Sequence, residues 1–193
     1  MKLVILDRDG TINADSADFI KSPEEWVALP GALEAIARLN HAGWHVVVAS
    51  NQSGLGRGLF DVASLNAMHA KMHRLLAVEG GRIDAIFYCP HTADDNCHCR
   101  KPAPGLFEQI GERYGVDLHG VPVVGDGLRD MVGGAAAGCE PHLVLTGKGE
   151  AFLGRALPEA FPANTRVHED LAAFATWLVA GDATVNPAPT GLL

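Results

Sequence analysis

The fold is decided by residues 2–11, which read KLVILDRDGT. Residues 2–6 form a short apolar run of the length expected for a buried parallel strand. The run continues into Asp7 and Asp9, and residues two apart in an extended segment point the same way. Two carboxylates held side by side need a cation or a proton between them. This pattern favours a metal-dependent site with Asp7 as nucleophile and Asp9 as general acid; the alternative is a solvated acidic loop after an edge strand.

The length, net charge and apolar content of the chain limit the kinds of protein that it can be. A length of 193 residues predicts one domain, residues 1–180, followed by a flexible tail over residues 181–193. The net charge is −8 and no basic run occurs, which argues against nucleic acid as a partner. No apolar stretch approaches the roughly 18 residues of a membrane span, and no signal-peptide pattern is present, so we expect a cytoplasmic protein. No long apolar stripe is left over for a partner chain, so we expect a monomer.

Short apolar runs alternate with helical patterns along the chain. Strands are predicted at residues 2–6, 44–49, 83–88, 121–124, 142–145 and 165–167. Helices are predicted at residues 31–41, 61–79, 104–114 and 169–179, with a short Ala- and Gly-rich helix ending at Gly138 and a loop or flap over residues 12–30. The alternation predicts an α/β fold with a doubly wound parallel sheet.

Polar clusters follow three of the predicted strands. The clusters are Asp7 with Asp9, Ser50 with Asn51, and Asp126 with Asp130. Ligands of parallel sheets bind outside the carboxyl ends of the strands, so these side chains are expected to meet in one crevice. The glycine-rich loop of residues 50–58 suits close approach to an anion, although such a loop is as often only a turn.

Three of the four cysteines fall within eleven positions, in the pattern C-x-H-x5-C-x-C. This spacing is typical of metal ligands in a reducing compartment, and thiolate and imidazole are the ligands that Zn²⁺ prefers. The predicted zinc ligands are Cys89, His91, Cys97 and Cys99. His98 is expected to point outward, and the alternative is a loop with free thiols. Cys139 is interpreted as a small buried apolar residue.

Other candidate residues have less specific surroundings. His69 and His73 lie one turn apart on the predicted helix 61–79 and could bind a metal, but a solvated helix face explains them. Arg100 and Lys101 directly follow the last cysteine of the loop, where an ordered loop could aim them at phosphate oxygens. The alternative for that pair is a solvated basic patch.

Taken in order, these clusters resemble the motifs of the haloacid-dehalogenase-like (HAD) phosphatases. The matching positions are residues 7–11, Ser50, Lys101, and Gly125-Asp126 with Asp130, and the resemblance covers about residues 1–150. The cysteine loop directly before Arg100 narrows the resemblance to a subgroup that holds heptose-bisphosphate phosphatases and histidinol-phosphate phosphatases. Residues 51–54 (NQSG), followed by Arg57, Gly58 and Phe60, look more like the heptose enzymes.

The resemblance implies a Rossmann-like HAD fold in which inserted loops and a zinc loop replace a large cap domain. Asp7 would attack phosphorus and form an aspartyl-phosphate, and Asp9 would act as general acid and base. Mg²⁺ would be held by Asp7, the Asp9 backbone carbonyl and Asp126, with Asp130 behind them. Ser50 and Lys101 would bind the transferring phosphoryl group. Contacts to the sugar or its distal phosphate are expected from Asp15, Ser16, Ala17, Asp18, Asn51, Gln52, Ser53, Arg100 and Lys101.

The implied activity is removal of the C7 phosphate of D-glycero-D-manno-heptose 1,7-bisphosphate, in the synthesis of activated heptose for lipopolysaccharide or other surface polysaccharide. Histidinol phosphate or another small phosphomonoester is the alternative substrate. A catalytically silent phosphosugar-binding protein is the alternative of another class, although every charged group that the mechanism needs is present. One departure is Gly127, since heptose enzymes often have Lys directly after the aspartate at that motif.

Overall fold

The computed structural model describes the backbone of residues 1–185 and the side chains of residues 1–181. Strands and helices alternate along the chain, as predicted. The strands are β1 (Leu3–Leu6), β2 (His45–Asn51), β3 (Ala85–Cys89), β4 (Pro122–Gly125), β5 (Glu140–Val144) and β6 (Arg166–His168). The helices are α1 (Ala32–His41), α2 (Ser53–Gly56), α3 (Val62–Val78), α4 (Gly105–Tyr114), α5 (Leu128–Ala136) and α6 (Leu171–Val185), with 3-10 turns η1 (Ala93–Asp95) and η2 (Gly147–Phe152). Within the described residues, no helix is long and apolar enough to cross a membrane.

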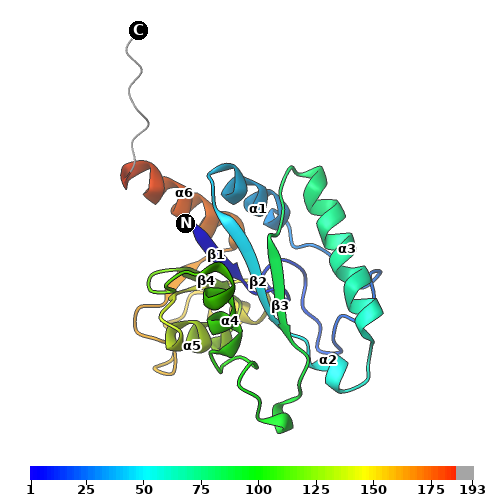
Figure 1. The fold of residues 1–193 in the computed structure, drawn as a ribbon. Helices are drawn as coiled ribbons and strands as arrows, with labels where there is room; N and C mark the ends of the chain where they lie inside the picture. The colour runs from blue at the N-terminus through cyan, green and yellow to red at the C-terminus, as the bar shows by residue number, and fades with distance from the viewer. Residues whose placement is uncertain (186–193) are drawn as a thin grey trace.

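Within residues 1–185 the strands form one parallel sheet in the order β3-β2-β1-β4-β5-β6 (Figure 1). β1 pairs with β2 on one side, where Leu3 lies opposite His45, and with β4 on the other, where Ile5 lies opposite Val123. The direction of winding therefore reverses at β1. A crevice forms at such a reversal point, outside the carboxyl ends of the strands. The predicted doubly wound parallel sheet is confirmed, and it places Asp7 and Asp9 at that crevice.

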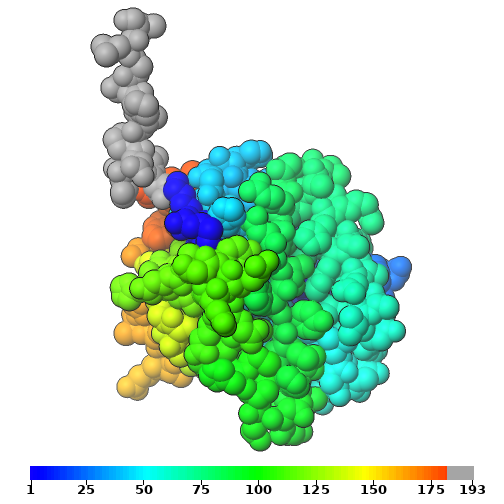
Figure 2. Space-filling view, in the orientation of Figure 1, coloured from blue at the N-terminus to red at the C-terminus, as the bar shows by residue number. Residues whose placement is uncertain are grey.

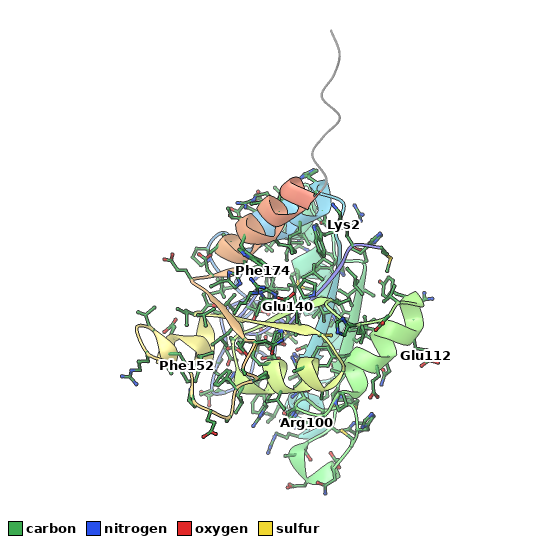
Figure 3. The ribbon with its side chains drawn as sticks, turned by 90° about the vertical axis from the view of Figure 1, so that its left-hand side faces the viewer. Lys2, Arg100, Glu112, Glu140, Phe152 and Phe174 are labelled. Carbon is green, nitrogen blue, oxygen red and sulfur yellow. The ribbon has the colours of Figure 1, made fainter. Side chains whose placement is uncertain are left out.

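Helices cover both faces of the sheet because successive side chains of a strand point to opposite faces. Val4 and Val46 pack in the cluster that contains the apolar residues of α1, α3 and α6. Leu3 and Val47 pack in the cluster that contains the apolar residues of α4. Figure 1 shows α1, α3 and α6 on one side of the sheet and α4 and α5 on the other. In Figure 3, Phe174 lies under α6 and is directed at the sheet, where it is fully buried.

Residues 12–30 form an irregular flap between β1 and α1, as predicted. Trp26 in this flap is fully buried. Lys71 Nζ on α3 donates hydrogen bonds to the carbonyl oxygens of Pro23 at 2.6 Å and Trp26 at 2.7 Å. Asn13 forms single backbone bridges with Asp9 and Ala28. The flap is therefore anchored to α3 and to the end of β1, which holds its middle part over the crevice.

The segment between β3 and α4 projects from the molecule. Figure 2 shows it as the green lobe at the bottom of the view, and Figure 3 places Arg100 at the opposite end of the sheet from Lys2. The segment therefore extends the carboxyl edge of the sheet, beside the crevice.

Three predictions about local structure were incomplete or wrong. α6 extends to Val185, so residues 181–185 are helical and not part of a tail, while residues 186–193 lie outside the described residues. The glycine-rich loop contains the short helix α2. His69 is half-buried against Tyr88 and Arg8 instead of lying on a solvated face, whereas His73 is exposed. The spacing of apolar residues in α3 predicts which side of the helix faces the core, but it could not show that the flap packs against this helix or that Arg8 lies beside His69.

Candidate active site and thiol cluster

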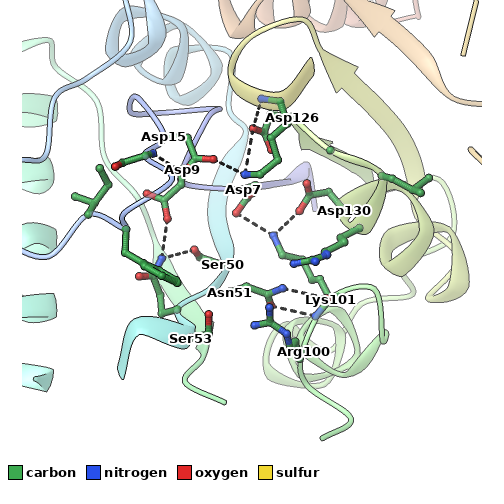
Figure 4. Close-up of a pocket in the computed structure, with 18 of the residues that line it drawn as sticks. Asp7, Asp9, Asp15, Ser50, Asn51, Ser53, Arg100, Lys101, Asp126 and Asp130 are labelled. Atoms are coloured by element: carbon green, nitrogen blue, oxygen red, sulfur yellow. Dashed lines mark hydrogen bonds and ion pairs between the residues drawn. The ribbon is translucent and has the colours of Figure 1, made fainter. Parts of the chain in front are cut away.

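A pocket of about 670 Å³ opens at the carboxyl ends of β1, β2 and β4 (Figure 4). All three pairs of polar residues that the sequence placed after strands line this pocket, so their predicted convergence is confirmed. The predicted site residues in the lining are Asp7, Asp9, Asp15, Ser16, Ala17, Ser50, Asn51, Gln52, Ser53, Arg100, Lys101, Asp126 and Asp130. Asp18 is not part of the lining; its backbone N–H is bonded to the Ser16 hydroxyl at 3.1 Å.

Lys101 ties the nucleophile candidate to the floor of the pocket. Its Nζ lies 2.9 Å from Asp7 Oδ1 and 2.5 Å from Asp130 Oδ1, and it donates to the Ala49 carbonyl oxygen at 2.6 Å. The side chain is 3% exposed, and these three acceptors match the three protons of an ammonium group. Burial lowers the pKa of Lys101, but the carboxylates of Asp130 and Asp7 outweigh burial and raise it. Lys101 is therefore a fixed positive charge.

Asp7, Asp126 and Asp130 form what we call the carboxylate cluster, in which one oxygen of each residue lies within 4.8 Å of the others. Burial and the neighbouring Asp130 raise the pKa of Asp7 well above its usual range, although Lys101 opposes this. Burial and Asp130 also raise the pKa of Asp126 to about 6. Such repulsion is relieved by a divalent cation, and carboxylate oxygens are the ligands that Mg²⁺ prefers. The donor set therefore fits Mg²⁺.

Glycine makes the approach of Asp126 to β1 possible. Gly10 has a φ of 79°, and a Cβ atom there would lie 2.0 Å from Asp126 Oδ2. The same oxygen accepts a hydrogen bond from the Lys148 backbone N–H at 2.8 Å. Any larger residue at position 10 would displace the Asp126 carboxylate, so Gly10 is required by the site itself.

Asp9 has the opposite electrostatic setting from Asp7. Arg8 reaches both of its oxygens, Asn13 Nδ2 donates to Oδ1 at 2.9 Å, and Gln52 Nε2 donates to Oδ2 at 3.0 Å. Burial raises the pKa of Asp9, but the Arg8 charge and these hydrogen bonds outweigh it and lower the pKa. The pKa values of the two carboxylates of this loop are therefore shifted in opposite directions, and Asp7, whose pKa is raised, needs a cation beside it to be the anion that a nucleophile must be.

The amide side chains at the carboxyl end of β2 are hydrogen-bonded within the protein. Asn51 donates from Nδ2 to the Lys101 carbonyl oxygen and accepts at Oδ1 from the Lys101 N–H, both at 3.0 Å. Gln52 donates to the Ser50 hydroxyl at 2.7 Å as well as to Asp9. These amides therefore position Lys101 and Asp9. Their predicted contacts to a sugar stay predictions.

The side chains of Cys89, His91, Cys97 and Cys99 meet in one place, which we call the thiol cluster. Their ligand atoms lie within 4.8 Å of one another. The sulfur–sulfur distances are 3.2 to 3.6 Å, and His91 Nδ1 lies 3.3 Å from Cys99 Sγ. The three cysteines of the cluster are free thiols. Four ligands 2.3 Å from a tetrahedral zinc ion stand about 3.8 Å apart, so the donor set and its spacing fit Zn²⁺.

The predictions that His98 points outward and that Cys139 is buried agree with the structure. His98 points outward to Glu108, with Nε2 and Oε2 2.6 Å apart. Cys139 is buried.

Arg100 lines the pocket and donates from its guanidinium to the His91 carbonyl oxygen at 3.2 Å. The thiol cluster and the pocket are therefore joined through residues 100 and 101.

Sequence reasoning missed several pocket residues. Lys148 contacts Asp15, and its Nζ lies 3.9 Å from Asp126 Oδ2. Its position just after β5, a fourth strand end, was the available signal. Arg57, which the sequence analysis noted only for its likeness to the heptose enzymes, also lines the pocket. Arg129 lines it too, and nothing in its spacing marked it. At Gly127 an added Cβ would meet only Asp130 Oδ2, at 3.7 Å, so a larger residue could be accommodated there.

Comparisons with known proteins agree with this geometry. The model of the HAD-hydrolase-like family matches residues 98–174. A D-glycero-beta-D-manno-heptose-1,7-bisphosphate 7-phosphatase of Bordetella bronchiseptica is 61% identical over 93% of this chain and 98% of its own length. A protein of the same name from Pseudomonas aeruginosa is 54% identical over 92% of this chain and 97% of its own length. A crystal structure of the Bordetella bronchiseptica phosphatase with magnesium and phosphate has a TM-score of 0.90 and 60% identity, covering 94% of this chain and 99% of that one.

The sheet order and the carboxylate cluster, together with the family match, define a hydrolase of the HAD-like superfamily. The predicted HAD fold is confirmed. At 61% identity over nearly the whole length, the chain belongs to the family of D-glycero-D-manno-heptose-1,7-bisphosphate 7-phosphatases, which are phosphoric monoester hydrolases.

Proposed function

We propose that this enzyme removes the C7 phosphate of D-glycero-β-D-manno-heptose 1,7-bisphosphate. The observation that carries the proposal is the buried Asp7–Lys101–Asp130 arrangement at the strand ends, in a chain 61% identical to a phosphatase of that name. The names of the relatives favour the heptose over histidinol phosphate, and they favour the β anomer. The pathway is then the synthesis of activated heptose for lipopolysaccharide or other surface polysaccharide.

Asp7 is the proposed nucleophile. One of its oxygens bonds to phosphorus while the bond from phosphorus to the sugar oxygen breaks, and water later hydrolyses the aspartyl-phosphate. Lys101 holds Asp7 Oδ1 at 2.9 Å and thus fixes the direction of attack. Ser50 and Lys101 are the proposed ligands of the phosphoryl oxygens, where a fixed positive charge stabilises the developing negative charge.

Asp9 is the proposed general acid and base. It gives a proton to the leaving sugar oxygen and then takes one from the attacking water. In the resting site Asp9 is an anion held by Arg8, Asn13 and Gln52. A phosphate ester placed beside it adds negative charge, which raises its pKa and favours the protonated form that the first step needs.

We propose that Mg²⁺ binds at Asp7, Asp126 and the Asp9 backbone carbonyl. Asp130 completes the carboxylate cluster and pairs with Lys101. When bound, Mg²⁺ supplies positive charge that brings an anionic substrate and anionic nucleophile together. The magnesium in the related crystal structure supports this assignment.

We propose that Zn²⁺ binds at Cys89, His91, Cys97 and Cys99 and has a structural role. The segment has few buried side chains of its own, with residues 93–96 all exposed. A metal ion supplies the order that a core would otherwise give. Arg100 and Lys101 follow the last ligand directly, so order in this loop determines where both cations lie.

The second phosphate of a bisphosphate needs positive charge away from the reacting centre. Arg57, Arg100, Arg129 and Lys148 all line the pocket, and they are the proposed contacts, together with residues 15–17 of the flap. The chain is proposed to act as a single domain that includes the whole of α6, and the monomeric state stays a prediction.

Phosphate release in the presence of Mg²⁺ tests the proposal. The substrates are the two anomers of heptose 1,7-bisphosphate, fructose 1,6-bisphosphate and histidinol phosphate, compared by kcat/KM. We expect at least a hundredfold preference for the β-heptose substrate, which corresponds to about 2.7 kcal/mol of transition-state discrimination. A preference for histidinol phosphate would contradict the proposed substrate. Binding without any turnover would identify a silent phosphosugar-binding protein instead.

A further inference from the structure

Arg8 is a fully buried cation whose hydrogen bonds converge on Asp9. Its Nε lies 3.0 Å from Asp9 Oδ1, and its NH2 group lies 2.9 Å from Oδ1 and 3.1 Å from Oδ2. NH2 also donates to Gln52 Oε1 at 3.3 Å, and Gln52 in turn donates to Asp9. The side chain of Arg8 is 0% exposed. The orientation of the Asp9 carboxylate therefore depends on the orientation of this guanidinium.

The remaining guanidinium nitrogen points to α3. NH1 of Arg8 lies 3.5 Å from Nε2 of His69, which comes from a helix 61 residues further along the chain. Arginine can only donate, so Nε2 of His69 accepts and the ring proton is on Nδ1. The neutral ring is favoured because burial and the Arg8 charge lower the pKa of His69 to about 4. His69 is itself fixed, since it is half-buried beside Tyr88 with ring centroids 6.4 Å apart.

We propose that His69 is a positioning residue of the phosphatase reaction: by accepting the hydrogen bond from Arg8 NH1, it sets the guanidinium plane that orients the Asp9 carboxylate. The inference rests on the proposed function, in which Asp9 is the general acid. His69 is not among the residues that line the pocket. Without its acceptor, a buried charged donor would be left unsatisfied, and Arg8 would turn toward another partner.

The proposal predicts an effect on one chemical step. In that step an Asp7 oxygen bonds to phosphorus, the bond from phosphorus to the leaving oxygen breaks, and the Asp9 proton passes to that oxygen. An alkoxide of a sugar is a poor leaving group and needs the proton, whereas p-nitrophenolate is a weak base and leaves without it. A misdirected Asp9 should therefore slow the sugar phosphate and leave p-nitrophenyl phosphate nearly unaffected.

The experiment compares wild type, His69→Leu and His69→Gln with the two substrates, β-heptose 1,7-bisphosphate and p-nitrophenyl phosphate. The measured quantity is kcat/KM, because it reports the steps up to formation of the aspartyl-phosphate and excludes its hydrolysis. For His69→Leu we expect a fall of about tenfold with the sugar phosphate and less than about twofold with the aryl phosphate. His69→Gln retains an acceptor and should recover most of the loss. His73→Leu, one turn along the same helix and exposed, is the matched control and should behave as wild type.

A purely structural role for His69 would lower kcat/KM for both substrates by the same factor, and that result would overturn the proposal. Wild-type rates with both substrates for His69→Leu would also overturn it. If His69→Leu does not fold, His69→Asn provides the same test, because the shorter amide keeps the polarity and cannot reach Arg8. An inactive wild-type enzyme would instead contradict the proposed function, so the two failures can be told apart.

Discussion

The carboxylate cluster and the thiol cluster are both candidate metal centres, yet they are built in different ways. Asp7 and Asp126 follow β1 and β4, two paired central strands, and Asp126 is 2% exposed. The thiol cluster has one ligand, Cys89, at the end of a strand, while the other three lie in a projecting loop. The sheet holds the first cluster in place against its own repulsion. The second cluster depends on its ligands to hold the loop.

This difference predicts different consequences of metal removal. The carboxylate cluster should keep its shape without Mg²⁺, because packing of the strands fixes the backbone on which it stands. The thiol loop should lose order without Zn²⁺, because little apolar surface is buried in it. The first metal is then needed for chemistry and the second for structure. Four changes to the protein or its metal content, with successively smaller expected effects, test this contrast.

Removal of the nucleophile should have the largest effect. Asp7→Asn keeps the size of the side chain and should lower kcat by at least about 10³-fold while the protein still folds, because the neutral amide cannot attack phosphorus. Turnover and the thermal unfolding midpoint are the measurements. Asp18→Asn on the exposed flap is the matched control and should keep full activity. Retained turnover in Asp7→Asn would overturn the nucleophile assignment.

Omission of Mg²⁺ should reduce turnover by roughly a hundredfold or more, since the anionic substrate would meet uncompensated carboxylates. Activity should return on addition of MgCl₂. Hydrogen exchange of residues 89–104 should not change between the two conditions, because the sheet carries the carboxylate cluster independently of the loop. Loosening of the loop in Mg²⁺-free buffer would show that the two centres are not separate.

Loss of a thiol ligand should affect binding more than chemistry. Cys97→Ser should lose bound zinc, exchange amide hydrogens faster over residues 89–104, and raise KM by about tenfold with a smaller change in kcat. Arg100 lies in the loosened segment, which is why KM responds. Asp94→Asn, an exposed change in the same loop, is the control. Unchanged zinc content in Cys97→Ser would count against this ligand set.

The smallest effect is expected where β2 contacts the segment that links the thiol cluster to the pocket, at the hydrogen bonds between Asn51 and Lys101. Asn51→Ala removes the two hydrogen bonds that hold the backbone of Lys101, and the loss of about 1 kcal/mol should lower kcat/KM about fivefold. Zinc content should stay unchanged, because Asn51 is paired with the thiol ligand Cys89 through the backbone of β2 and β3, and the substitution leaves that backbone in place. An effect as large as that of Asp7→Asn would mean that Asn51 itself contacts the substrate.

The sequence contained enough information to predict the sheet and both clusters. Apolar runs that end in Asp, Ser or Asn place polar groups at one edge of a parallel sheet, and the spacing from Cys89 to Cys99 limits its ligands to one loop. The hydrogen bonds of Asn51 could not be predicted, because they depend on how the thiol loop returns to β2. The proximity of His69 to Arg8 likewise depends on the packing angle of α3, which periodicity does not give.

The pairing of β1 with β4 also has a consequence for the newly made chain. Asp7 is synthesised long before Asp126, so Leu6 finds its partner Val124, and Asp7 its neighbour Asp126, only after residue 126 has been synthesised. At about 5–20 residues per second, that is a delay of many seconds. During this time the Asp-Arg-Asp loop is not yet a metal site. We therefore expect magnesium to enter late, and the carboxylates of an unfinished chain to remain hydrated and inert toward cellular phosphate esters.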